Sequence, residues 1–91
     1  MVVKLKLVVS MRNGDKKQII VEEKDPKGYL VDKETRERKE ISLTDREVQA
    51  EYSRKIAENV EKKKPIHLVD NEGRIYVINS YDISSIDIEV V

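Results

Sequence analysis

The feature that most constrains the fold is the alternation of apolar and polar residues in the first segment of the chain. Val3, Leu5, Leu7, Val9 and Met11 share one face of residues 2–11, and Lys4, Lys6 and Ser10 lie on the other. A period of two is what a strand with one buried face requires. Asn13-Gly14 follows, a pair that supplies the positive φ angles of a type I′ turn. The segment therefore predicts a β-hairpin whose return strand covers about residues 17–23.

Short apolar runs separated by turn residues predict five further strands. They lie at residues 29–31, 39–43, 66–69, 74–78 and 83–90. Pro26 and Gly28 mark the turn before the first of them, because proline fixes φ and glycine accepts any value. The charged loop at residues 32–38 joins the first two strands, which we expect to form a second hairpin.

One amphipathic helix is expected between Thr44 and Pro65. Thr44 is a good N-cap, Glu47 completes a capping box three residues later, and Pro65 stops the helix. The apolar residues within it recur every four positions, which gives one narrow stripe that we expect to face the sheet. These residues are Val48, Tyr52, Ile56 and Val60. Two ion pairs with i,i+4 spacing are expected on the solvent-exposed faces of the helix, Glu51–Lys55 and Glu58–Lys62.

The apolar composition favours a sheet-based core. The chain has 12 Val and 10 Ile but only 5 Leu, with no Phe or Trp, and β-branched side chains suit a pleated surface. Ninety-one residues fit a single domain, 1–91. The predicted order ββ-ββ-α-βββ indicates an α+β fold. We expect a bent antiparallel sheet or a small open β-barrel, with the helix covering one side.

The charges cancel overall but are unevenly distributed. The chain has 18 basic and 18 acidic residues, yet Arg74 is the only basic residue after position 64, against five acidic ones. This asymmetry fits complementary surfaces between subunits, or simply two parts of one solvated surface. With no cysteine, no signal-peptide pattern and no apolar stretch long enough to span a bilayer, we expect a cytoplasmic protein that does not contact membranes.

No set of residues in the sequence suggests catalysis, a metal site or a cofactor. His67 is the only histidine and lacks a neighbouring partner for a triad or metal cluster. The three glycines form no phosphate-binding loop, and residues 70–72 lack the ligand spacing of a calcium loop. We therefore expect a protein that is not an enzyme and that uses no cofactor.

Two sets of residues are candidates for binding. Arg36, Arg38, Arg74 and Tyr76 combine the residue types that hold small anionic ligands. The terminal strands are apolar on both faces in places, which requires either double coverage or pairing with another chain. Their candidate interface residues are Val2, Val3, Val8, Val90 and Val91. Lys4 and Lys6 are interpreted as protection of a strand edge, and a homo-oligomer is expected.

The closing segment, residues 72–79 and 82–88, resembles the last strands of small uncharacterised β-rich accessory proteins of phages and mobile elements of Gram-positive bacteria. The resemblance implies an accessory role, either binding and inhibiting a host protein or sequestering a small nucleotide. Three hypotheses follow from the sequence. The first is a non-catalytic, self-associating binding protein, the second a sponge-like protein that holds an anionic nucleotide between subunits, and the third a small nucleic-acid-binding barrel. The neutral total and the four aromatic residues make nucleic acid the less favoured partner.

Overall fold

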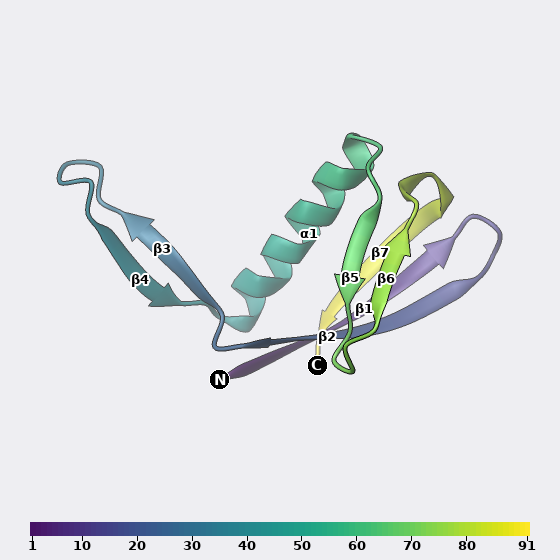
Figure 1. The fold of residues 1–91 in the computed structure, drawn as a ribbon, viewed down its shortest axis with the longest axis horizontal. Coiled ribbons are helices and arrows are strands. Elements are labelled where there is room, and N and C mark those ends of the chain that lie inside the picture. Colours follow the sequence, from purple (N-terminus) through teal and green to yellow (C-terminus); the bar gives the residue numbers. More distant parts are fainter.

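The computed structural model describes residues 1–91 and confirms the predicted α+β class and the order of its elements (Figure 1). In chain order the elements are β1 (Val2–Met11), β2 (Lys16–Lys24), β3 (Lys27–Val31), β4 (Arg38–Ser42), α1 (Asp45–Glu61), β5 (Ile66–Val69), β6 (Ile75–Ile78), the 3-10 helix η1 (Ser80–Asp82) and β7 (Ile83–Val90). Neither α1 nor η1 has the length and apolar character needed to cross a lipid bilayer.

The strands divide into three antiparallel sheets, where the sequence predicted one bent sheet or barrel. The largest has the order β2-β1-β7, and β3–β4 and β5–β6 are separate hairpins. The first hairpin has its turn at the expected place, where Gly14 takes a φ of 95°, but Asn13 does not have the positive φ that a type I′ turn requires, so the predicted turn type was wrong. The interpretation of Lys4 and Lys6 as edge protection was wrong, because β1 is the central strand and pairs on both sides. Lys4 instead forms an ion pair across the sheet with Glu22, at 3.2 Å.

The hydrophobic core lies between the large sheet and α1, as expected from the alternation in β1. The inward residues of β1, from Val3 to Val9, are at most 1% exposed and cluster with buried residues of four other elements, β2, α1, β5 and β6. The buried cluster consists of Val3, Leu5, Leu7, Val9, Ile19, Val21, Val48, Ile56, Ile66, Leu68 and Ile78. The β5–β6 hairpin closes this core on the side of β2, where the Asn71 backbone N–H donates to the Ile20 carbonyl at 2.8 Å.

The helix begins as predicted and ends earlier than Pro65. Thr44 and Glu47 form the capping box, with both of its hydrogen bonds at 3.3 Å. Val48 and Ile56 are buried, but Val60 is 41% exposed, so the stripe predicted to face the sheet does so only in part. The two expected i,i+4 ion pairs, Glu51–Lys55 and Glu58–Lys62, are absent, and Glu58 pairs instead with Arg54 at 3.0 Å.

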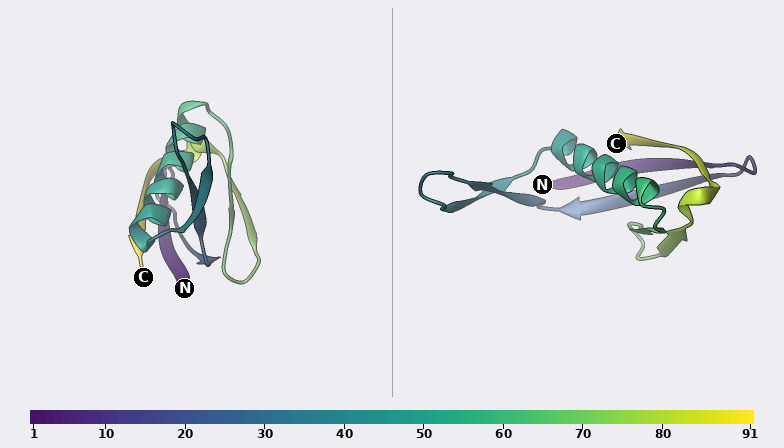
Figure 2. Two further views of the ribbon diagram at one scale, coloured as in Figure 1. Left: turned by 90° about the vertical axis from the view of Figure 1, so that its left-hand side faces the viewer. Right: turned by 90° about the horizontal axis from the view of Figure 1, so that it is seen from above.

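The β3–β4 hairpin projects from the rest of the molecule, and we refer to residues 27–42 as the arm (Figures 1 and 2). No other strand or helix makes extensive contact with it. The molecule measures 51 × 28 × 19 Å with a radius of gyration of 15.1 Å, whereas a compact domain of this length has about 12 Å. The arm accounts for this elongation.

Candidate functional site

The four residues predicted to bind an anionic ligand do not meet within one chain. Arg36 and Arg38 belong to the arm, whereas Arg74 and Tyr76 belong to the β5–β6 hairpin on the opposite side of α1 (Figure 1). Arg74 is exposed and lies 3.6 Å from the Glu72 carboxylate. A site that used all four residues would require at least two copies of the chain.

Tyr76 faces the core, and its two neighbours in β6 face solvent. The Tyr76 hydroxyl donates to the Asp70 carboxylate at 3.4 Å, and Asp70 also accepts the backbone N–H groups of Glu72 and Arg74 at 2.9 and 2.8 Å. Asp70 therefore stabilises the turn between β5 and β6. The sequence left this orientation open because β6 reads Ile-Tyr-Val-Ile, which is compatible with burial of either face.

The outer face of the β5–β6 hairpin is an exposed apolar surface. It consists of Val69 and Val77, both more than half exposed, and Ile75, the most exposed large apolar residue of the chain. Ladder pairing places Val69 opposite Ile75 and His67 opposite Val77. His67 thus lies on the face opposite Ile66 and Leu68, as predicted.

The terminal valines proposed for an oligomer interface fall into different environments. Val3 is 1% exposed within the core, so its side chain is not accessible to a second chain. Val2, Val90 and Val91 are exposed at the ends of β1 and β7, and Val8 is half-buried on the sheet face away from α1. Val3 therefore belongs to the core, whereas the other four valines remain accessible to a second chain.

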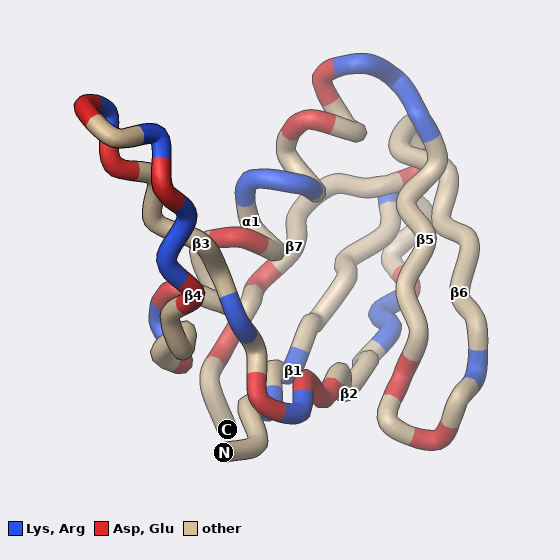
Figure 3. Tube along the Cα trace, turned by 60° about the vertical axis from the view of Figure 1, so that its left-hand side comes forward, with Lys and Arg blue, Asp and Glu red and all other residues tan.

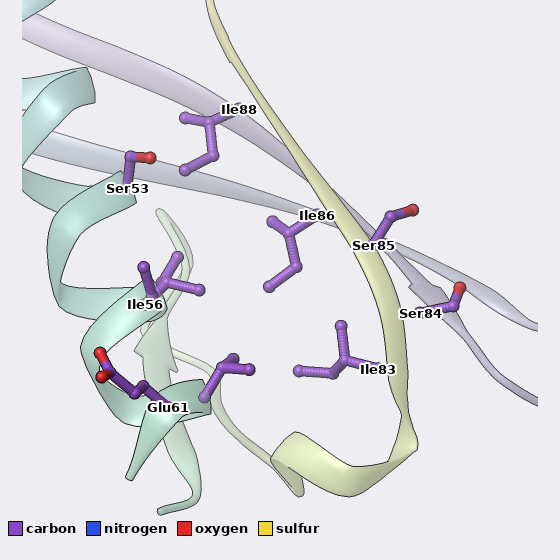
Figure 4. Close-up of a pocket in the computed structure, with 10 residues that line it drawn as sticks. Ser53, Ile56, Glu61, Ile83, Ser84, Ser85, Ile86 and Ile88 are labelled. Atoms are coloured by element: carbon purple, nitrogen blue, oxygen red, sulfur yellow. The ribbon is translucent and has the colours of Figure 1, made fainter. Parts of the chain in front are cut away.

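A groove between α1 and β7 is the main apolar concavity on the surface. The core is closed beside β2 but open beside β7, where a groove of about 420 Å³ runs between helix and strand (Figure 4). Its lining residues are Ser53, Ile56, Ala57, Val60, Glu61, Ile83, Ser84, Ser85, Ile86 and Ile88. Figure 4 shows Ile83, Ile86 and Ile88 of β7 pointing toward the helix across the groove.

One wall of this groove is an open strand edge. β7 pairs with β1 on one side and with no strand on the other. The Gln49 side-chain amide donates to the Ile88 carbonyl at 2.7 Å, so the backbone of Ile88 faces away from β1. Because backbone groups alternate along a strand, those of Ile86 and Val90 face the same way. The N–H groups of Ile86 and Ile88 have no strand partner and can pair with an added strand, whereas the Ile88 carbonyl already accepts the bond from Gln49.

The arm exposes three consecutive large apolar residues. Tyr29, Leu30 and Val31 are 57–62% exposed, and only Tyr29, at the base of the arm, lines a shallow pocket together with residues of α1. Basic and acidic residues are interleaved along the arm (Figure 3). Lys27 and Glu40 are paired at 2.8 Å, and this hydrogen bond raises the pKa of the Lys27 ammonium.

A polar cleft lies at the base of the arm, where β2, α1 and β5 meet. The Tyr52 hydroxyl donates to the Glu23 carboxylate at 2.7 Å, and Lys55 and His67 also line the cleft. Burial, followed by the hydrogen bond to Glu23, raises the pKa of the Tyr52 phenol. This cluster could not be predicted from the sequence, because its members come from three elements that are distant in the chain.

Comparison with protein-family models, with curated proteins and with solved structures finds no match for this chain. The resemblance to phage accessory proteins therefore stays a prediction, and a function has to be argued from the geometry of the chain itself.

Proposed function

We propose that the chain is a non-catalytic binding protein that self-associates through a strand edge. The observation that carries this proposal is the open edge of β7 beside the apolar α1–β7 groove. An unpaired strand edge offers a row of backbone donors and acceptors to any added strand. The groove next to it offers apolar surface whose burial contributes about 25 cal/mol per Å².

Two further surfaces support binding as the general role. The arm and the outer face of the β5–β6 hairpin each expose three large apolar residues on regular secondary structure. Contiguous apolar surface of this kind commonly marks sites where proteins interact. Binding to a host protein, the role implied by the phage-like resemblance, would use one of these surfaces.

Sequestration of a small anionic nucleotide between subunits is the second candidate. This candidate rests on the distance between Arg36 and Arg38 in the arm and Arg74 in the β5–β6 hairpin. These arginines can meet around one ligand only across an assembly of several copies. Nucleic acid is the less favoured ligand, because proteins bind it with a continuous basic surface and the basic and acidic residues in Figure 3 are interleaved.

Sedimentation velocity and a native mass spectrum of freshly purified protein test the proposal together. Self-association predicts a species heavier than the 10.6 kDa chain. Extra mass of a few hundred daltons per assembly would move the assignment to the nucleotide-binding candidate. A protein that remains monomeric at all accessible concentrations would refute the proposal.

A further inference from the structure

We propose that the partner of the open β7 edge is the arm of a second copy of this chain, so that two copies exchange arms. This inference rests on the proposed self-association and names the surfaces that carry it. One strand of the arm adds to β7, and apolar side chains of the arm enter the α1–β7 groove.

The arm lacks the contacts that a hairpin needs for stability. Two-stranded hairpins without a covering element are marginally stable in water, and the five-residue strands of the arm have no extensive contact with any other strand or helix. The only ion pair of the arm, Lys27–Glu40, is exposed on both sides and contributes little. Burial of Tyr29, Leu30 and Val31 therefore has to come from a surface outside the chain.

The unpaired charges of β4, one strand of the arm, are complementary to those of β7. Asp87 and Glu89 are the only charged residues of β7, and neither has an ion-pair partner in the chain. In β4, Arg38 and Lys39 are free of ion pairs and Glu40 is paired with Lys27, whereas the loop at the tip of the arm carries unpaired charges of both signs. Two β7 edges paired with each other would bring acidic residues of both copies close together, which is destabilising. The arm supplies cations to the same edge, and this difference favours the arm as the occupant.

The arm leaves the body close to the place where β7 ends. It joins the first turn of α1 through Leu43 and Thr44, and that turn lies beside Val90 in a shallow groove with Asp45 and Arg46. A two-fold axis at this end of the molecule directs each arm along the β7 edge of the other copy. Five residues of extended chain span about 17 Å, so the eight residues of β7 are long enough to accept an arm strand.

Matched serine substitutions on two exposed apolar surfaces test the proposal. Val31 in the arm and Val77 on the outer face of the β5–β6 hairpin are 57% and 59% exposed, so neither is needed for the fold of one chain. Sedimentation equilibrium of wild type, Val31→Ser and Val77→Ser gives the dimer dissociation constant of each. Val31→Ser should raise it about tenfold or more, the effect of losing buried aliphatic side chains, and Val77→Ser should leave it unchanged.

The outcomes separate this inference from the proposed function. If the wild type is a monomer, both self-association and arm exchange are refuted. If all three proteins form equally stable dimers, arm exchange is refuted and self-association is not. Cross-linking gives a second readout, because the chain has no cysteine of its own. A short bis-maleimide should join Val31→Cys to Ser85→Cys in a mixture of the two variants, and not Val77→Cys to Ser85→Cys. The reverse pattern would contradict the exchange.

Discussion

Val48 and Val60 belong to one apolar stripe of α1 but differ in burial, and this difference predicts different costs for the same substitution. Val48 is 2% exposed in the core and Val60 is 41% exposed at the rim of the α1–β7 groove. Replacing valine with alanine removes the equivalent of two methylene groups. It also improves helix propensity at both positions by roughly 0.5 kcal/mol.

The expected magnitude follows from what each side chain loses. At Val48 the transfer of two buried carbons is worth about 1.6 kcal/mol, and the enclosed site adds a cavity cost of roughly 1 kcal/mol. After the propensity gain, Val48→Ala should lower the free energy of unfolding by about 2 kcal/mol. At Val60 only part of the transfer energy is lost and no cavity forms. The free energy of unfolding of Val60→Ala should therefore stay within about 0.5 kcal/mol of the wild-type value.

Urea titration of the wild type and both variants measures these differences, provided that the slopes of the transitions agree. The titrations need a protein concentration low enough to keep the chain monomeric. Equal losses for the two variants, or a larger loss for Val60→Ala, would refute the partial burial of the stripe and would mean that the last turn of α1 packs on the sheet after all.

Three further substitutions test the local structure. Thr44→Ala should lower the free energy of unfolding by about 1 kcal/mol in the same titration, because it removes the capping box with Glu47; no loss would mean that the cap does not contribute. Tyr52→Phe should cost about 1 kcal/mol through the lost hydrogen bond to Glu23. Because burial and that bond raise the pKa of Tyr52, its contribution is complete below the unfolded value near 10 and is lost as the pH rises further. Wild-type stability should therefore fall more steeply than that of Tyr52→Phe above pH 10, and parallel curves would contradict this. His67→Ala should leave self-association unchanged in sedimentation, because the His67 side chain is exposed outside the proposed interface; a tenfold weakening with the fold preserved would overturn that placement.

Local signals in the sequence were sufficient for most of the individual elements. The alternation in β1, the place of the turn at Asn13-Gly14 and the Thr44–Glu47 capping box each depend on residues close together in the chain, and the structure contains all three, although the turn is not of type I′. Short-range periodicity determines which face of such an element is apolar. The buried residues of β1 and the start of α1 follow directly from it.

Features that depend on how distant elements meet could not be predicted in this way. Tyr76 is turned inward and Ile75 outward, and a strand of four apolar residues does not specify that choice. Val60 continues the pattern of Val48, but the core is open where it lies. The separation of the arm from the body has the same origin, because alternation within a hairpin does not tell whether another element covers it.

Backbone amide exchange along β7 at two protein concentrations tests self-association most directly. The Ile86 and Ile88 amides face away from β1 and have no strand partner within the chain. If a second copy adds a strand to this edge, exchange at both amides should slow markedly from low to high micromolar concentration, while the Asp87 amide, which faces β1, changes much less. Identical exchange rates for Ile86 and Ile88 at both concentrations would show that the edge stays open, and would contradict self-association through β7.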